Sequence, residues 1–352
     1  MPPDFEWRTT TPDADVLYVH RRVGEAEVYF LSNQKNRFED VAATFRVSDR
    51  APELFDPATG AVTRPGVFRS EHGRLTLPLR MEPFGSVFIV FREPLPARHA
   101  VALAAQPPGT TPSSPAFEVE RTAAGQLVAR CWKSGASATL VWNDGTRAEI
   151  QSPAMPEPAE LAGPWQVSFP PNLGAPPSAT FDKLVSLSEH AEPGIRFFSG
   201  TATYRTAFAP RAPAAGSKIF LDLGDVQVIA EVKLNGRDLG ILWKPPFRVD
   251  VTGALQAGAN ELEIRVTSLW PNRMIGDAAL PDDVPWNRER PRGAYPAAWP
   301  DWLVQGQPRP SGRFAFCTRK DVYAKDDPLL PSGLMGPVRL LTAAEVSLGG
   351  GK

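Results

Sequence analysis

The chain has 352 residues, of which 42% are hydrophobic and 22% are charged, so it can bury the cores of two or three domains. Lys and Arg number 38 against 39 Asp and Glu, for a formal net charge of -1, a balance that favours neither nucleic acid nor an anionic membrane as partner. No apolar run approaches the roughly 20 residues that a membrane-spanning helix needs.

Proline is frequent, with 38 residues, and glycine adds 28. Because proline breaks helices and central strands, this composition predicts many short strands joined by irregular loops. Cys131 and Cys317 allow one disulfide, but neither a disulfide framework nor a thiol-rich metal site. The N-terminal stretch has no apolar signal core, which predicts a cytoplasmic chain as written. A periplasmic or secreted full-length parent stays open.

Residues 15–93 alternate in the manner of antiparallel strands. Runs of five to eight residues rich in Val, Phe, Tyr and Leu are separated by Gly, Pro, Asn and Asp, as in "DVLYVHR", "AEVYFLSN" and "GRLTLPLR". In "GSVFIVFR" both faces are apolar, which predicts a central, buried strand. We therefore expect a β-sandwich over residues 1–94.

Residues 94–116 are dominated by Pro, Ala, Ser and Thr and are predicted to be a linker or a long irregular connection. Three strand-like pieces follow in "AFEVERTA", "QLVARCWK" and "SATLVWNDGTRAEI", the last with a hairpin turn at Asn143-Asp144-Gly145. The sequence predicts a Pro-rich linker plus a small β unit over 95–159.

Residues 160–352 predict a second sandwich of the jelly-roll type. "AEVKL" and "NELEIRVTSL" alternate apolar and charged residues, and Asn235-Gly236 is a strong hairpin signal. Residues 271–332 form a long loop region rich in Pro and Trp, and "SGLMGPVRLLT" closes the unit as a last strand. Such a long loop in a compact domain is usually functional or poorly ordered. The predicted fold class is thus all-β, a β-sandwich followed by a galactose-binding-like jelly roll.

Four stretches carry a resemblance to a known family: "RFFSGTATYRTAF", "FLDLGDVQVIAEVKLNGRDLGILWKPPFRVDVTGAL", "GANELEIRVTSLWPNRMIGD" and "LLPSGLMGPVRL". They resemble the sugar-binding jelly roll of glycoside hydrolase family 2 and, more closely, the C-terminal region of family 106 α-L-rhamnosidases. "DVLYVHRRVGEAEVYFLSNQ" and "PELFDPATG" are similar to the β region that follows the family 106 catalytic barrel.

This resemblance implies that the catalytic barrel, which carries the glutamates and a calcium-assisted sugar site of the family, would precede a segment like this one. No alternating strand–helix pattern occurs here, so none of those residues can be transferred onto this chain. The chain also departs from the family pattern, with Leu187 where a tryptophan is expected and Arg319-Lys320-Asp321 where a Trp-Lys-His run is expected.

Tryptophans are the first candidates for carbohydrate binding, because an indole packs against the apolar face of a pyranose and its N–H can reach a hydroxyl. Trp243 follows a strand, and core packing at the strand end is the competing interpretation. The loop tryptophans are the better candidates, although they too could pack against a domain. The full predicted set is Trp243, Lys244, Trp270, Asn272, Arg273, Trp286, Trp299 and Trp302.

Catalysis by the chain itself would need two carboxyl groups roughly 5 to 9.5 Å apart. The acids best placed for this share loops with tryptophans, although a solvated surface role is the ordinary expectation for each: Asp277, Asp282, Asp283, Glu289, Asp301, Asp326 and Asp327. No metal site or cofactor is predicted, and a structural calcium ion at the "KDDP" turn (325–328) stays open. The four histidines are scattered, and no HExxH, CxxC or GxSxG spacing occurs.

Three hypotheses follow. The first is a glycoside-hydrolase-related, non-catalytic, glycan-contacting region, whose partners are carbohydrate and either a catalytic domain or a second copy that covers the barrel-facing surface. The second is a self-sufficient compact glycosidase of the β-galactosidase or α-L-rhamnosidase type that uses the loop carboxylates. The third is a structural remnant without affinity for sugars. Sequence alone leaves open the sugar, the linkage, the oligomeric state and whether Met1 is the natural start.

Overall fold

The computed structural model describes residues 3–106, 115–210, 216–287, 295–316 and 322–348. Strands dominate these residues, and they divide into two compact units. Unit 1 comprises residues 1–157, 213–219 and 342–352, and unit 2 comprises 158–212 and 220–341. The finer division predicted above, at 94/95 and 159/160, stays a prediction. Within the described ranges, none of the helices has the length and apolar character needed to cross a bilayer.

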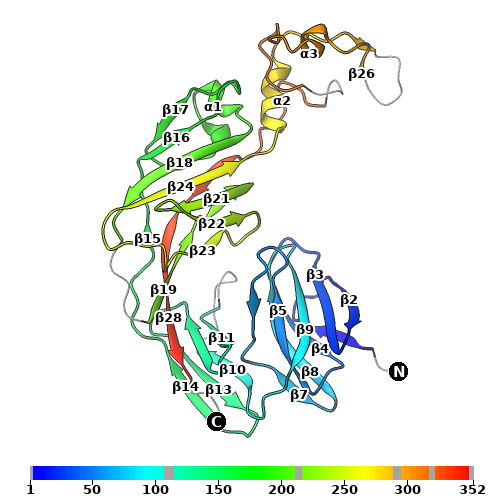
Figure 1. Cartoon of the computed structure of the whole chain (residues 1–352), viewed down its shortest axis with the longest axis vertical. Helices are drawn as coiled ribbons and strands as arrows, with labels where there is room; N and C mark the ends of the chain where they lie inside the picture. The colour runs from blue at the N-terminus through cyan, green and yellow to red at the C-terminus, as the bar shows by residue number, and fades with distance from the viewer. Residues whose placement is uncertain (1–2, 107–114, 211–215, 288–294, 317–321, 349–352) are drawn as a thin grey trace. The chain divides into compact units, whose positions relative to one another are not determined.

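The first part of unit 1 is a sandwich of two antiparallel sheets (Figure 1). One sheet has the order β1-β4-β8-β7 and the other β2-β3-β9-β5-β6. The strands of the first are β1 (Phe5–Arg8), β4 (Glu39–Phe45), β7 (Arg69–Glu71) and β8 (Arg74–Met81). Those of the second are β2 (Val16–Val23), β3 (Ala26–Asn33), β5 (Arg50–Phe55), β6 (Val62–Thr63) and β9 (Ser86–Pro94). β9 lies between β3 and β5, so its predicted central position is confirmed.

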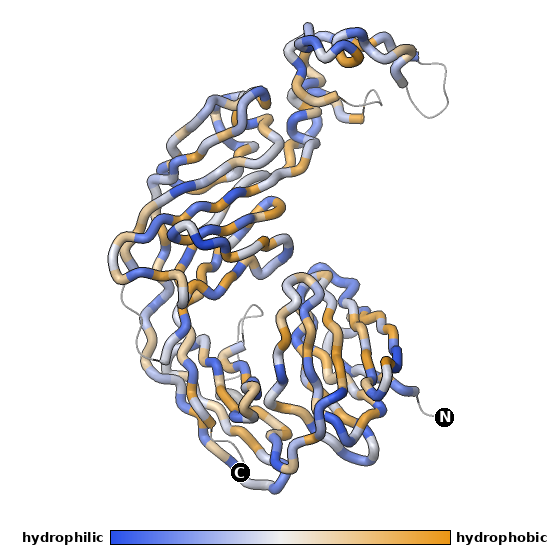
Figure 2. The backbone as a smooth tube through the Cα atoms, in the orientation of Figure 1, coloured by the Kyte–Doolittle hydropathy of each residue, from blue (hydrophilic) through white to orange (hydrophobic). Residues whose placement is uncertain are grey.

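The core of this sandwich comes from alternate residues of facing strands, as the alternating colours of the tube in Figure 2 show. Tyr29, Phe45 and Phe91 meet there, with ring centroids 4.8 Å apart for Tyr29–Phe45 and 5.1 Å apart for Phe45–Phe91. All three rings are fully buried. Burial of such aromatic side chains is the main source of stability expected for a sandwich of this size.

The second part of unit 1 is a smaller β unit built on β10 (Ala100–Gln106), β11 (Phe117–Arg121), β12 (Leu127–Cys131), β13 (Ser137–Trp142) and β14 (Arg147–Gln151). The predicted hairpin at 143–145 joins β13 and β14. β10 corrects the expectation of an irregular connection over 94–116, because it pairs with β13 along its length. Cys131 is a buried free thiol in this core, and Cys317 lies outside the described residues.

Unit 2 contains a six-stranded antiparallel sheet of order β17-β16-β18-β24-β21-β22. Its strands are β16 (Trp165–Ser168), β17 (Ser178–Phe181), β18 (Thr201–Phe208), β21 (Ile229–Leu234), β22 (Arg237–Leu242) and β24 (Asn260–Thr267). The inner face carries Trp165, Tyr204 and Ile264, each at most 1% exposed. The predicted Asn235-Gly236 turn joins β21 and β22, with φ angles of 54° and 77° that suit this pair of residues.

Unit 2 also holds several short elements. They are β15 (Ala159–Glu160), η1 (Leu187–Glu189), α1 (Pro193–Arg196), β20 (Asp225–Gln227), β23 (Arg248–Asp250), α2 (Pro271–Ala278), β25 (Trp286–Asn287), β26 (Tyr295–Pro296), α3 (Asp301–Val304) and β27 (Gly333–Gly336). β19 (Ser217–Asp222) and β28 (Arg339–Ser347) each have residues in both units. The chain is thus an all-β protein with sandwich architecture, as predicted.

Candidate functional site

Helix α2 starts the long region that the sequence predicts as a loop. Pro271 occupies its first position, where the missing N–H costs no hydrogen bond. Asn272 is 2% exposed. Its side-chain nitrogen donates to the Leu330 carbonyl oxygen (2.8 Å), and its side-chain oxygen accepts from the Leu330 N–H (2.8 Å). Asn272, a predicted sugar contact, therefore ties the far end of the long region back to the helix.

The next residue, Arg273, forms a buried ion pair with Asp277 one helical turn further along, with Arg273 Nε 3.0 Å from Asp277 Oδ1 and the two side chains 6% and 4% exposed. Asp277 Oδ2 also accepts the backbone N–H groups of Phe314 (2.9 Å) and Ala315 (2.7 Å). The guanidinium lies over the Phe314 ring, 4.9 Å from its centroid. Burial lowers the pKa of Arg273, and Asp277 acts against that shift. The pair fastens residues 314–315 to α2.

A second carboxylate, Asp283, is held by side chains from far along the chain. It accepts from Arg309 Nε (2.6 Å) and Nη2 (2.9 Å) and from Ser311 Oγ (2.6 Å). Burial acts to raise the pKa of Asp283, but the hydrogen bonds from Arg309 and Ser311 outweigh it, and the pKa of this carboxyl is lowered. A general acid needs the opposite shift. The neighbouring Asp282 accepts from the indole N–H of Trp286 (2.9 Å).

The predicted loop tryptophans differ in their surroundings. Trp302 lies in α3, with the Arg309 guanidinium 4.8 Å from its ring centroid and the Phe316 ring 5.8 Å away. Trp299 is 59% exposed, and its ring is tilted 45° to the Phe316 ring at a centroid distance of 6.0 Å. Trp302 therefore packs within the folded loop region, while Trp299 presents an indole to solvent.

The remaining candidate acids are dispersed. Asp301 lies exposed in the first turn of α3, and Asp326 is exposed. Asp327 Oδ2 accepts the Ala324 N–H (2.8 Å), so the turn at 324–327 is closed by its own hydrogen bonds. Glu289 lies outside the described residues. Within the described ranges, no group of three or more His, Cys, Asp or Glu side chains is arranged to hold a metal ion.

Trp243 lies at a different place, at one end of the six-stranded sheet. β21 begins at Ile229, and its two neighbours β22 and β24, both antiparallel to it, end at the same level. Trp243 follows β22, and Leu269 follows β24. Five exposed apolar side chains thus gather at this sheet end, and we call them the exposed corner: Ile229 (40% exposed), Ile241 (57%), Trp243 (53%), Leu269 (56%) and Trp270 (48%). Lys244 is half-buried beside it.

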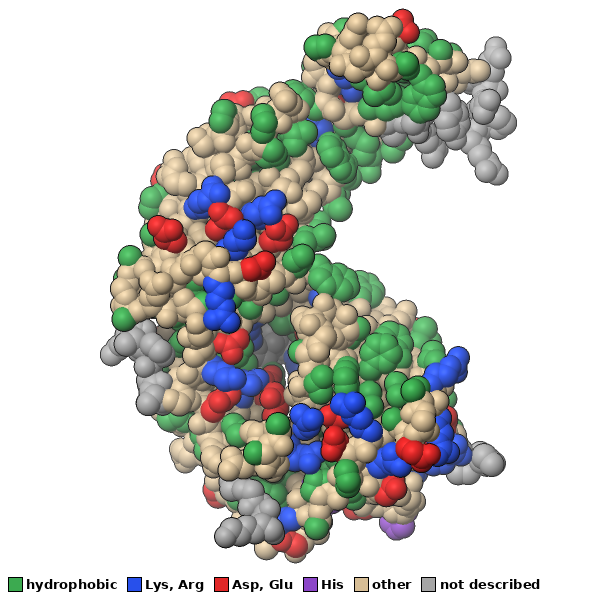
Figure 3. Space-filling view, viewed as in Figure 1, with side chains coloured by type: hydrophobic (Ala, Val, Ile, Leu, Met, Phe, Trp, Pro, Cys, Tyr) green, Lys and Arg blue, Asp and Glu red, His purple; other side chains and the backbone are tan. Residues whose placement is uncertain are grey.

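Away from this corner the outer face of the sheet is charged. Arg205 pairs with Glu263 (2.7 Å), and Arg265 pairs with Glu231 (2.5 Å), so the two signs alternate across neighbouring strands. Figure 3 shows this mixture of blue and red side chains, with hydrophobic side chains gathering toward the end of the sheet where β21 and β22 lie. A charged face with both signs in alternation is solvated, which makes the apolar corner the unusual feature.

Sequence reasoning missed Ile229, Ile241 and Leu269 as neighbours of Trp243. The sequence did contain a signal for the exposure of Ile229, because the alternation that points Ala230 inward points Ile229 outward. The meeting of three strand ends depends on register, however, and no local pattern encodes it.

Comparison with known proteins gives two family matches. Residues 1–68 match the α-L-rhamnosidase model of glycoside hydrolase family 106. Residues 186–312 match the galactose-binding-like domain model of glycosyl hydrolase family 2. The chain is related to glycoside hydrolases. The resemblance to both families predicted above is confirmed by these matches.

Individual relatives of this glycoside-hydrolase-related chain are much longer than it is. A putative β-glucuronidase of Formosa agariphila is 46% identical over 197 residues, which is 55% of this chain and 16% of the relative. The structure of a rhamnosidase from Novosphingobium sp. PP1Y is 31% identical, with a TM-score of 0.66 over 97% of this chain and 25% of the rhamnosidase. The chain therefore spans between a sixth and a quarter of the length of these two relatives.

Proposed function

We propose that this chain is a non-catalytic, glycan-contacting β region of a glycoside hydrolase, and that the exposed corner is its glycan surface. The observation that carries the proposal is a contrast within unit 2. Asp277 and Asp283, the most buried of the described candidate acids, are engaged in structural contacts, while the indole of Trp243 is 53% exposed beside other apolar side chains. Exposed indoles are the groups that pack against the apolar faces of pyranose rings.

The catalytic alternative has weaker support. A glycosidase needs one protonated carboxyl with a raised pKa beside a second carboxylate. Asp277 is ion-paired and bound by two backbone amides, and Asp283 is bound by Arg309 and Ser311 with a lowered pKa. Both carboxylates are engaged in contacts that stabilise the fold, and the lowered pKa of Asp283 is the opposite of the shift that a general acid needs.

A non-catalytic region needs a catalytic region that it supports. Both relatives extend far beyond the part that aligns with this chain. We propose that the hydrolytic chemistry resides in such a further region and that this chain supports it by contacting the glycan. The galactose-binding-like match over residues 186–312 includes all five residues of the exposed corner.

The test is retention of the purified chain on immobilised glycans rich in rhamnose or galactose. Trp243→Ala should reduce retention about tenfold, the loss expected for one well-stacked ring. It should change the free energy of unfolding by less than about 0.5 kcal/mol, because the side chain is exposed. Phe84→Ala, at a 65% exposed aromatic in unit 1, is the matched control and should leave retention unchanged. Equal retention by both variants would remove the exposed corner as the glycan surface.

A further inference from the structure

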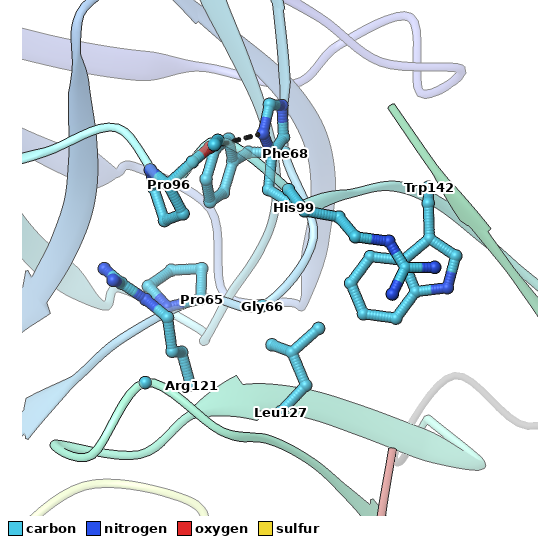
Figure 4. A pocket seen from close by; sticks show the side chains of 11 residues that line it. Pro65, Gly66, Phe68, Pro96, His99, Arg121, Leu127 and Trp142 are labelled. Atoms are coloured by element: carbon cyan, nitrogen blue, oxygen red, sulfur yellow. Dashed lines mark hydrogen bonds between the residues drawn. The ribbon is translucent and has the colours of Figure 1, made fainter. Parts of the chain in front are cut away.

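Unit 1 contains a cavity of about 280 Å³ that none of the predicted site residues lines. Its walls come from residues 65–68, from residues 96–99 and from the small β unit (Figure 4). The volume lies just below the range typical of pockets for drug-sized molecules, so a ligand of one ring would fill it.

The walls are held by backbone hydrogen bonds and are therefore preformed. The N–H of Gly66 donates to the Val119 carbonyl (2.8 Å), and the N–H of Arg121 donates to the Arg64 carbonyl (2.8 Å). Gly66 lies so close to β11 that a Cβ atom there would come within 2.7 Å of Val119 Cγ1. Because the walls are already ordered, ligand binding does not have to include the free-energy cost of ordering them.

Flat and apolar side chains make up most of the lining. His99 stacks on Phe68 with a centroid distance of 4.9 Å and an interplanar angle of 9°. His99 Nδ1 donates to the Pro96 carbonyl (3.1 Å), because a carbonyl oxygen can only accept. Figure 4 shows Leu127 below the open space and Trp142 beside it. Surfaces of this kind suit the face of a six-membered ring.

The cavity also holds one guanidinium without a partner. Arg98 lies over Trp142, 4.1 Å from the ring centroid, and is paired with Asp144 (3.2 Å). Arg121, in contrast, has two buried nitrogens, Nε and Nη2, that make no hydrogen bond. Within the described part of the chain, no carboxylate lies within 4.0 Å of it. Burial and the charge of Arg64 lower the pKa of Arg121.

The charges of Glu93 and Glu53 oppose the lowering of the Arg121 pKa, but among the described residues neither forms an ion pair with Arg121. Glu53 is fully buried and already occupied by Arg64 (3.0 Å) and Arg92 (2.6 Å). A buried polar group without a partner is rare in folded proteins and calls for an explanation. A guanidinium presents parallel N–H groups whose spacing matches the two oxygens of a carboxylate.

We propose that this cavity binds a small molecule that carries a carboxylate on a six-membered ring, with Arg121 as the anion anchor and the Phe68, Leu127 and Trp142 walls against the ring. The ring is that of a sugar acid or of an aromatic acid, which share this chemistry. The site lies in unit 1, on other residues than the exposed corner, and does not depend on the function proposed for unit 2.

The experiment is isothermal titration of the full chain with D-glucuronate and with benzoate. D-glucose serves as a ring without the charge, and inorganic sulfate as a charge without the ring. At least one of the two carboxylates should saturate with a dissociation constant of about 1 mM or tighter. Arg121→Gln should weaken it at least about tenfold. The matched control, Arg147→Gln at an exposed position of β14, should bind as the parent does.

Arg121→Gln should fold, because it removes an unpaired buried charge and not one half of an ion pair. Arg121→Lys gives a second variant, which keeps the charge but loses the paired donors. The proposal is overturned if neither carboxylate saturates by about 10 mM, if Arg121→Gln binds as tightly as the parent, or if sulfate or glucose binds equally well. Whichever of glucuronate and benzoate binds more tightly identifies the ring.

Discussion

The buried ion pair of Arg273 and Asp277 leads to the most specific prediction about the stability of unit 2. Asp277→Ala removes the carboxylate of a residue that is 3% exposed, and this carboxylate accepts two backbone N–H groups, from Phe314 and Ala315. It also leaves the Arg273 guanidinium buried, with aromatic rings at 4.9 and 6.0 Å and no opposite charge. Phe314 and Ala315, which lose their hydrogen-bond acceptor, join the long region 279–316 to the rest of unit 2.

The size of the effect follows from these contacts. Breaking a buried ion pair by removing one partner costs about 3–5 kcal/mol. Each backbone N–H loses a charged acceptor, a bond worth about 1.5–3 kcal/mol. Because the same carboxylate makes all three contacts, these contributions overlap, and we expect a total of about 3–5 kcal/mol. Replacing Arg273 and Asp277 together by leucine should recover part of this loss, since no unpaired charge remains.

Two measurements check the prediction. Denaturant unfolding gives the loss of global stability, and amide hydrogen exchange at Phe314 and Ala315 detects local opening if the long region detaches first. Glu263→Ala is the matched control, because its partner Arg205 is 53% exposed and such pairs contribute less than about 1 kcal/mol. If Asp277→Ala costs no more than Glu263→Ala and both amides stay protected, the role assigned to the buried pair is wrong.

Two further predictions concern the same region. The folded-state pKa of Asp283 lies below the value of 3.8 for a free aspartate. Its stabilising contribution is therefore complete at neutral pH and is lost as the pH falls below about 4 through the lowered pKa, so tryptophan fluorescence should report loosening in acid that Asp283→Asn already shows at pH 7. Trp302→Ala should loosen the loop region and increase its proteolysis, whereas Trp299→Ala, at a 59% exposed side chain, should not. Equal proteolysis of both variants would contradict the packing role of Trp302.

Most strands were predictable from alternation because one face of each is buried. Leu262, Ile264 and Val266 of β24 are each at most 1% exposed, as the period of two requires. The turns at Asn143-Asp144-Gly145 and Asn235-Gly236 were equally predictable from the sequence, since few other residues adopt the φ angles that these turns need.

Helix α2 escaped prediction for a physical reason. Its eight residues include Gly276, which lowers helix propensity. The glycine is required, because a Cβ atom there would lie 2.6 Å from the Phe197 ring. β10 escaped for a similar reason, since alanine is depleted in strands and only its pairing with β13 makes "AVALAAQ" extended. In both cases tertiary contacts override local preference.

The candidate sites were harder to predict from the sequence than the helices and strands. Asp283 looks available in the sequence, and its partners Arg309 and Ser311 lie 26 and 28 residues further along the chain. The cavity around Arg121 combines residues from 65 to 142, and no short motif connects them. Sequence identified residue types suited to glycan contact, but only the fold separates acids engaged in structure from side chains that remain exposed.

The measurement that tests the central claim most directly is product release from nitrophenyl β-galactoside, α-rhamnoside and related glycosides by the purified chain. A non-catalytic glycan-contacting region should give no turnover above buffer, while it is retained on immobilised glycan through Trp243. Turnover that follows the protein through purification and falls by orders of magnitude when one loop acid, such as Asp301, becomes an amide would contradict the account.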